Sequence, residues 1–152
     1  MQQLNNKGFT LIELIVTLLV LTILALIAAP SFAKIYTRQK LESTVRDITM
    51  KISEARMQAI TLRNSTGICL SSLSEQACAA ALSISETEKN RIFFVQLEHG
   101  VAAHTNSATN LIFRNNGSIA ASVNFILNKN EQSYCINVGI TGDARVREGI
   151  CT

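Results

Sequence analysis

The feature that most constrains this chain is an apolar run from Phe9 to Ala29, which consists mostly of Leu, Ile, Val and Ala. In a helix that rises ~1.5 Å per residue, about 20 such residues span a hydrocarbon core of about 30 Å. The run follows a short polar segment, Met1 to Gly8, which carries one basic side chain, Lys7. A secretory signal peptide would be cleaved after its apolar stretch, but the proline of Ala28-Ala29-Pro30 disfavours a site there. We therefore predict a helix that spans a membrane once.

The residues at the front of this run, Lys7-Gly8-Phe9-Thr10-Leu11-Ile12-Glu13-Leu14, closely resemble the type IV prepilin signature of pilins and of type II secretion pseudopilins. The resemblance covers the leader and the apolar helix without a gap. It implies that a membrane-embedded prepilin peptidase cleaves after Gly8 and N-methylates the new terminus, Phe9. It also implies a bacterial inner-membrane protein with one span and a periplasmic C-terminal domain. Such a subunit then enters a cell-surface pilus or a periplasmic pseudopilus.

Glu13 is the one ionisable residue of the apolar run and lies roughly one turn inside it. An ionised carboxylate in a membrane costs on the order of 3 kcal/mol or more, so it requires a partner or a function. After cleavage, the ammonium group of Phe9 on a neighbouring subunit would be a suitable counter-charge, and the pair would penalise misregistered packing. The alternative is that Glu13 reaches the headgroups near the helix end. We favour the first interpretation, in which Glu13 sets the axial register between subunits.

Pro30 is the only proline of the chain and follows the apolar run directly. Within a helix a proline removes a backbone hydrogen bond and kinks or locally melts the helix, so we predict a helix break at this position. By resemblance to pilins, the helix would unwind near here on entering the filament. The predicted divisions are a leader at 1–8, a transmembrane and filament-core helix at 9–30, an amphipathic helix at 31–63 and a periplasmic β-rich domain at 64–152.

The segment from Ser31 to Arg63 has the apolar periodicity of a helix. Apolar residues recur at spacings of three and four, which places them on one face: Leu41, Val45, Ile48, Ile52, Ala55, Ala59 and Leu62. Basic residues occupy the opposite face, with Glu42, Asp47 and Glu54 between them: Lys34, Arg38, Lys40, Arg46, Lys51 and Arg56. A nucleic-acid face is one interpretation, but a solvated face with internal ion pairs is favoured.

Beyond the turn formers Asn64-Ser65-Thr66-Gly67, short apolar segments predict strands. They are Ile68 to Leu70, Arg91 to Leu97, Leu111 to Arg114, Val123 to Leu127 and Ser133 to Val138. Asn115-Asn116-Gly117 predicts a hairpin turn, and residues 129–132 predict a second one. We expect a helical turn at Ala77 to Leu82 and a polar surface loop at Ser83 to Asn90. The predicted fold class is α+β, with a long N-terminal helix packed on a small antiparallel β-sheet.

The chain has four cysteines, Cys69, Cys78, Cys135 and Cys151. None belongs to a CxxC pair, and the histidines are not at zinc-ligand spacing to them, so no metal site is predicted. In an exported chain an even number of cysteines indicates two disulfides, and four cysteines allow three pairings. We favour Cys69 with Cys78 and Cys135 with Cys151, because each pair is nearest in sequence and closes a short loop.

The region after the long helix also resembles the GspH/FimT group of minor pilins and pseudopilins. The segments that carry the resemblance are Leu111 to Ser118, a strand through Cys135, and Thr141-Gly142-Asp143-Ala144-Arg145-Val146-Arg147. The last resembles the Gly-Arg-x-Arg ending of that group, with Ala144 in place of the glycine. The resemblance implies a low-abundance subunit that helps initiate or cap a filament. Its partners would be other minor pilins, major pilins, the prepilin peptidase and the inner-membrane assembly platform.

Some FimT-like subunits are DNA receptors that use a basic C-terminal segment, which here would assign phosphate contact to Arg145 and Arg147, assisted by Arg114. On an extended strand Arg145 and Arg147 lie on one face, and guanidinium groups suit bidentate phosphate contact. However, Asp143 and Glu148 flank the pair and dilute its field, and no aromatic cluster lies nearby to stack bases. We favour solvated or ion-paired edge-strand arginines over sequence-independent contact with double-stranded DNA.

The sequence contains no recognisable Ser-His-Asp or Cys-His arrangement and no phosphate loop, so we predict neither an enzyme nor a bound cofactor. Three functions remain open. The leading one is a minor type IV pilin that takes part in pilus assembly at the filament tip. The second is the equivalent pseudopilin of a type II secretion system. The third is a pilus-tip subunit that binds DNA for uptake.

Overall fold

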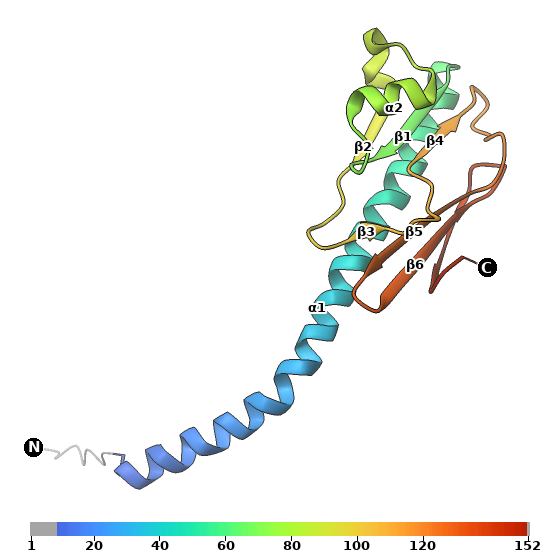
Figure 1. Ribbon diagram of the computed structural model, residues 1–152. Coiled ribbons are helices and arrows are strands. Elements are labelled where there is room, and N and C mark those ends of the chain that lie inside the picture. The colour runs from blue at the N-terminus through green and yellow to red at the C-terminus, as the bar shows by residue number, and fades with distance from the viewer. Residues whose placement is uncertain (1–8, 152) are drawn as a thin grey trace, which may run out of the picture. The chain divides into compact units, whose positions relative to one another are not determined.

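The computed structural model describes residues 9–151, and its ribbon is shown in Figure 1. The chain divides into two compact units, residues 1–36 and 37–152, and one helix, α1 (Leu11–Leu62), runs through both. The elements after α1 all belong to the second unit: β1 (Thr66–Leu70), α2 (Glu75–Leu82), a 3-10 segment η1 (Glu86–Arg91), β2 (Ile92–Val95), β3 (Ala102–Ala103), β4 (Asn110–Phe113), β5 (Val123–Lys129), β6 (Gln132–Val138) and β7 (Ala144–Glu148).

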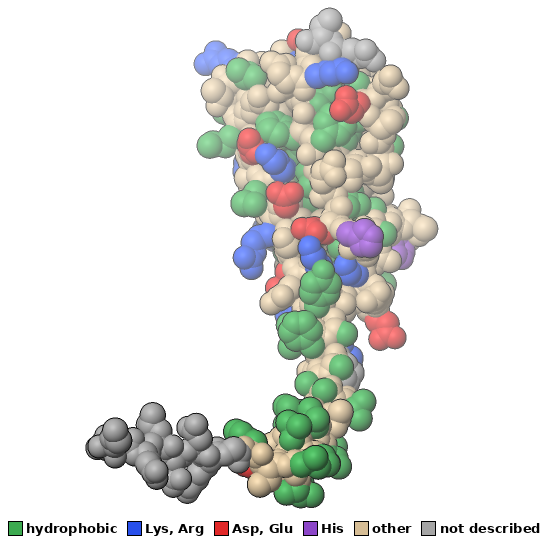
Figure 2. Space-filling view, turned by 90° about the vertical axis from the view of Figure 1, so that its left-hand side faces the viewer, with side chains coloured by type: hydrophobic (Ala, Val, Ile, Leu, Met, Phe, Trp, Pro, Cys, Tyr) green, Lys and Arg blue, Asp and Glu red, His purple; other side chains and the backbone are tan. Residues whose placement is uncertain are grey.

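In the first unit, α1 exposes its apolar side chains on every side. Leu and Ala are strong helix formers, and the intervening Ile and Val continue the helix at little cost. Every large apolar side chain described between Phe9 and Ile35 is exposed. Hydrophobic side chains cover this part of the surface in Figure 2. By length and composition α1 is a candidate membrane span, and such an apolar surface requires lipid or another helix to cover it.

The helix continues through Pro30, which corrects the predicted break. Backbone helix is present on both sides of residue 30, and α1 has a single span from Leu11 to Leu62. A proline removes one amide hydrogen bond and crowds the carbonyl four residues earlier, but the strong helix formers on either side continue the helix past it. Unwinding near Pro30 on entering a filament stays a prediction.

In the second unit, one face of α1 supplies the helical side of the main core. Six of the residues on the predicted apolar face are buried: Leu41, Val45, Ile48, Ile52, Ala55 and Ala59. The seventh, Leu62, is 51% exposed, so its assignment to the core was wrong. Leu62 is the last residue of α1, and Arg63 follows in the left-handed region with φ 49°, which turns the chain away.

A three-stranded sheet with the order β2-β1-β4 packs on this face of α1. All five residues of β1 are buried, because both faces of the sheet are covered. Ile68 and Leu70 join the core with α1, whereas Cys69 joins a second apolar cluster with residues of α2. The strand β1 is antiparallel to β4 but parallel to β2, and the chain segment between the parallel strands contains α2.

The second apolar cluster contains a disulfide that links Cys69 of β1 to Cys78 of α2. Ser74 caps α2 by accepting a hydrogen bond from the Ala77 amide at 3.2 Å. Ile84 is buried in the same cluster, so the predicted polar loop at Ser83 to Asn90 contributes to the core and ends in η1. The single Ile in this polar stretch was too weak a signal to predict that packing.

A four-stranded antiparallel sheet with the order β3-β5-β6-β7 packs on the same core. Phe125 and Leu127 of β5 and Ile136 of β6 are fully buried in the cluster that contains α1. The predicted turn at residues 129–132 joins β5 to β6 as a hairpin, with Lys129 opposite Gln132 and Asn130 at φ 53°. The α+β class with a long N-terminal helix is confirmed, but residues 9–151 form two sheets where one was predicted.

The predicted hairpin at Asn115-Asn116-Gly117 is a tight turn that joins strands of different sheets. The Arg114 amide donates to the Ser118 carbonyl at 2.8 Å, and Gly117 has φ 77°. The strands on either side, β4 and β5, lie in separate sheets. A local turn sequence predicts the reversal of the chain, but it does not predict which strand the returning segment will pair with.

Candidate functional site

The N-terminal candidate site begins with a capped helix. The Glu13 amide donates a hydrogen bond to Thr10 Oγ1 at 3.3 Å, which satisfies one of the free amides at the start of α1. The Glu13 side chain is the acidic group of the first helical turn, where a negative charge is favourable to the helix dipole. Phe9 is 82% exposed beside it. Gly8, the residue before the predicted cleavage site, lies outside the described residues.

The Glu13 carboxylate has no basic group of its own chain within ion-pair distance among residues 9–151. It is surrounded along α1 by exposed Leu, Ile and Val side chains. A carboxylate in that position requires a counter-charge once the apolar surface is covered.

The C-terminal candidate site lies on β7, the last strand of the four-stranded sheet. Arg145 is opposite Asn137 and Arg147 is opposite Cys135 in the register of β6 with β7. Opposed residues of an antiparallel pair share a face, and Tyr134, Ile136 and Val138 of β6 point into the core with α1. Arg145 and Arg147 therefore lie together on the outer face of the sheet, as the alternation predicted.

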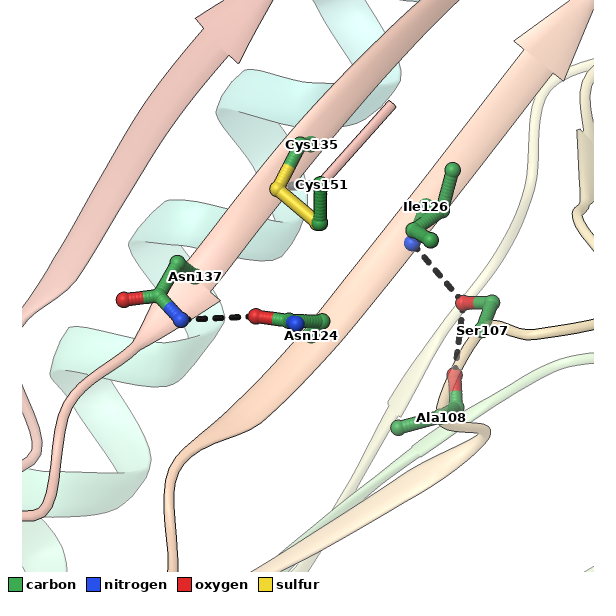
Figure 3. Close-up of a disulfide and its surroundings, with 7 residues drawn as sticks. All are labelled: Ser107, Ala108, Asn124, Ile126, Cys135, Asn137 and Cys151. Carbon is green, nitrogen blue, oxygen red and sulfur yellow. Dashed lines mark hydrogen bonds between the residues drawn. A yellow bond between two sulfur atoms is a disulfide. The ribbon is translucent and has the colours of Figure 1, made fainter. Parts of the chain in front are cut away.

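A disulfide between Cys135 and Cys151 fixes this outer face, as Figure 3 shows. In the same view Asn137 donates a hydrogen bond to Asn124 at 2.6 Å, and Ser107 Oγ accepts one from the Ile126 amide at 2.9 Å. Both disulfides thus have the pairing that was favoured from sequence. The loop closed by Cys135 and Cys151 contains β7, which is therefore tied to β6 at both ends.

The charges around Arg145 and Arg147 are mixed. Arg145 is 74% exposed and pairs with Asp143 at 3.3 Å. A hydrogen bond from the Thr141 hydroxyl is the largest cause that lowers the pKa of Asp143, and the charge of Arg145 adds to it. Arg114 is exposed at the end of β4, in the other sheet, and no contact in the described region joins it to Arg145 or Arg147.

The polar face of α1 carries ion pairs, as the favoured interpretation predicted. Arg38 pairs with Glu42 at 2.7 Å, and Lys51 pairs with Glu54 at 2.7 Å. Lys40 reaches Glu98 in the loop after β2 at 2.8 Å, and this contact lowers the pKa of Glu98. These pairs engage Arg38, Lys40 and Lys51 within the domain, which weakens the case for a nucleic-acid face on the helix.

Sequence reasoning missed a cluster in which α1, β6 and β7 meet. The Tyr134 hydroxyl lies 3.0 Å from Glu42 and 2.9 Å from Glu148, and Arg38 pairs with Glu148 at 2.5 Å. Only the spacing of Arg38 and Glu42 by four residues could have pointed to it. The remaining partners are far apart in sequence and meet only in the folded domain.

Within the described part of the chain, no group of three or more His, Cys, Asp or Glu side chains is placed to hold a metal ion. His104 instead supports a turn, since its Nδ1 accepts a hydrogen bond from the Asn106 amide at 3.2 Å. The His99 carbonyl accepts a hydrogen bond from Lys129 at 2.6 Å. His104 therefore supports a turn with its side chain, whereas the contact of His99 is made by its backbone.

A single exposed apolar helix that leads directly into a small disulfide-bonded α+β domain is the architecture of a membrane-anchored pilin or pseudopilin. Comparison with family models agrees with this class. Residues 3–29 match the prokaryotic N-terminal methylation motif, and residues 44–142 match the family described as type II transport protein GspH. The second match covers more than half of the chain, so the chain belongs to the GspH family. The comparisons with curated proteins and with solved structures gave no match.

Proposed function

We propose that this chain is a minor type IV pilin that takes part in pilus assembly at the filament tip. The observation that carries the proposal is the exposed apolar part of α1 with a single carboxylate, Glu13, near its start. The prepilin peptidase cleaves between Gly8 and Phe9 and methylates Phe9, within the segment that matches the methylation motif. The mature helix then leaves the inner membrane for the filament, where other minor and major pilins cover it.

In the filament, the Phe9 ammonium group of one subunit pairs with Glu13 of its neighbour. A buried ion pair contributes little net stability, but an unpaired buried charge costs several kcal/mol. Packing with the wrong axial offset would leave both charges unpaired among Leu and Ile side chains. The pair therefore selects one register of helix packing, while the apolar surface supplies the attraction. The assembly platform of the inner membrane and the periplasmic position of residues 37–152 are parts of the same proposal.

The experiment compares Glu13→Ala with Thr17→Ala in cells that carry the remaining pilus components. Thr17 lies one turn further along α1, and its hydroxyl bonds only the Leu14 carbonyl at 2.8 Å, so it is a matched control. We expect normal leader removal in both variants, strongly reduced filament incorporation of Glu13→Ala, and normal incorporation of Thr17→Ala. Normal incorporation of Glu13→Ala would reject the register role.

A pseudopilin of a type II secretion system is the second candidate, and the description of the matching family favours it. The peptidase site and the helix packing would be the same in both systems. Deletion of the gene separates the two functions. Loss of surface pili with normal protein secretion supports the pilin, and loss of secretion with normal pili supports the pseudopilin.

A DNA-binding role at the pilus tip is the third candidate, favoured by the common outer face of Arg145 and Arg147. Binding would be weak, sensitive to salt and indifferent to sequence, because it would rest on phosphate contacts. A shift assay at low salt compares the domain with Arg145→Ala/Arg147→Ala and with a control, Arg63→Ala/Lys89→Ala, that removes the same charge elsewhere. Equal retardation of all three proteins, or of none, would exclude this role.

A further inference from the structure

The strand β7 is an edge of the four-stranded sheet. It pairs with β6 along one side, and within residues 9–151 no strand pairs with its other side. The backbone amides and carbonyls along that side are therefore available to another strand. Natural edges are commonly protected by a bulge, a proline, a covering loop or charged side chains. Of these protections β7 has the charges of Arg145, Arg147 and Glu148, and its five residues lie in unbroken register with β6.

An apolar groove runs beside this free edge, between β7 and α1. Its volume is about 280 Å³, and it is lined by Glu42, Val45, Arg46, Thr49, Tyr134 and Val146. Val146 is 42% exposed, although its side chain is on the face of β7 that looks toward α1. A strand added to β7 would place alternate side chains over this groove, where Val45 and Val146 would cover them.

Covalent and hydrogen-bonded contacts within the domain fix the position of the β7 edge without a partner. The disulfide between Cys135 and Cys151 ties down its C-terminal side, and the Gly149 amide donates to the Ser133 carbonyl at 2.8 Å. The turn that leads into β7 is closed by the Gly142 amide, which donates to the Gly139 carbonyl at 2.7 Å. A rigid edge loses little conformational entropy when a strand adds to it.

The charges on β7 disfavour a second copy of this chain as the added strand. Antiparallel pairing of two β7 strands about Val146 places Arg145 of each copy opposite Arg147 of the other, and like charges directly opposite are destabilising. Pairing about Arg145 or Arg147 instead places two identical arginines opposite each other. Pairing about Ala144 would place Arg145 opposite Asp143, but Asp143 precedes β7, so the two β7 strands would then overlap only at Ala144. Acidic side chains at the same positions would be attracted, and the exposed ion pair of Arg145 with Asp143 is weak enough to exchange.

We propose that the free edge of β7 accepts an extended segment of a partner protein as a fifth strand. Acidic side chains of that segment alternate with apolar ones. The acidic side chains meet Arg145 and Arg147 on the outer face, and the apolar side chains enter the groove beside Val146. Backbone hydrogen bonds supply affinity, and the alternation supplies specificity.

The test uses the full chain in detergent micelles and two labelled peptides of about seven residues, a typical strand length. In one peptide Glu alternates with Val, and in the other Lys alternates with Val. Fluorescence anisotropy should show that the Glu–Val peptide binds at least about tenfold more tightly. The preference should reverse in Arg145→Glu/Arg147→Glu. It should persist in Arg63→Glu/Lys89→Glu, which changes the charge equally at other exposed positions.

A third peptide, Glu–Val with alternate backbone amides methylated, separates strand addition from attraction of charges alone. It should not bind, because it cannot form the hydrogen bonds of a strand pair. Equal binding of this peptide, binding of neither unmethylated peptide, or an unchanged preference in the reversed variant would each overturn the proposal. Self-association of the chain that Val146→Lys abolishes would assign the edge to a second copy and would also overturn it.

Discussion

The hydroxyl group of Tyr134 lies 2.9 Å from Oε1 of Glu148, which joins β6 to the edge strand β7 on the side that faces α1. The same hydroxyl lies 3.0 Å from Glu42, and Arg38 pairs with both carboxylates. Burial is the largest cause that raises the pKa of Tyr134 to about 12, followed by the hydrogen bonds to Glu148 and Glu42. One phenol therefore links the helix, β6 and β7.

We expect the stability of the domain to fall between about pH 10 and pH 12 because of Tyr134. The folded state favours the neutral phenol, so this contribution is complete below the unfolded pKa of 10.0 and is lost as the pH rises through about 12. It amounts to at most roughly 2–3 kcal/mol. Urea denaturation of residues 37–152 across this range measures it, and both apolar clusters lie within these residues.

Tyr134→Phe is the control for that titration. It should lower the free energy of unfolding by roughly 1–2 kcal/mol at neutral pH and abolish the part of the pH dependence that comes from the phenol. Tyr134 is the only tyrosine of residues 37–152, so its tyrosinate absorbance reports the folded-state pKa directly. A midpoint near 10 would contradict the burial and hydrogen bonding described here.

Gly142→Ala should destabilise the domain by roughly 2–4 kcal/mol. Gly142 has φ 83°, and a Cβ there would lie 2.4 Å from the Gly117 carbonyl oxygen. Gly149→Ala is a matched control, because Gly149 has φ 94° but nothing within 4 Å of an added Cβ. The free energy of unfolding of Gly149→Ala should fall by about 1–2 kcal/mol, from backbone strain alone. Equal losses in urea denaturation would show that the contact between the two turns does not matter.

The helix and its apolar face could be predicted because local spacing determines them. Residues three and four apart on α1 share a face, so Leu41 and Ile48 were assigned to the core from sequence and are buried there. The same rule failed at Leu62, because periodicity does not show how far along the helix the rest of the domain covers it. Glu13 could be identified because a carboxylate within an apolar run is itself unusual.

The partition into two sheets could not be predicted, because it depends on contacts between distant segments. The chain leaves β4 through a tight turn at Gly117, and the Ile119 amide then donates to the Ile140 carbonyl at 2.9 Å before the chain reaches β5. The parallel pairing of β1 with β2 needs a crossover segment, and α2 in that segment is joined to β1 by the Cys69–Cys78 disulfide. The Tyr134 cluster has the same origin, since Glu42 and Tyr134 are 92 residues apart.

Removal of the Cys69–Cys78 disulfide should cost more stability than removal of the Cys135–Cys151 disulfide. The chain-entropy contribution alone predicts the opposite order, because the loops span 9 and 16 residues, but that difference is only about 0.5 kcal/mol. Cys69 and Cys78 are both fully buried in the second apolar cluster, whereas Cys151 is partly exposed. We expect losses of roughly 2–5 kcal/mol for each paired Cys→Ala variant in urea denaturation. The reverse order would show that loop entropy outweighs packing.

Replacement of Gly8 by a bulkier residue should block removal of the leader. Gly8 precedes the proposed cleavage site within the segment that matches the methylation motif. Gly8→Val should leave full-length protein in the inner membrane, where mass spectrometry detects an unmethylated chain that begins at Met1. Asn5→Ala, a leader variant away from the cut, should be processed normally to a methylated chain that begins at Phe9. Because the uncleaved chain has no ammonium group at Phe9 to pair with Glu13, Gly8→Val should also be excluded from filaments.

Two outcomes would contradict this account. One is removal of the leader from Gly8→Val, and the other is normal filament assembly of the uncleaved Gly8→Val chain.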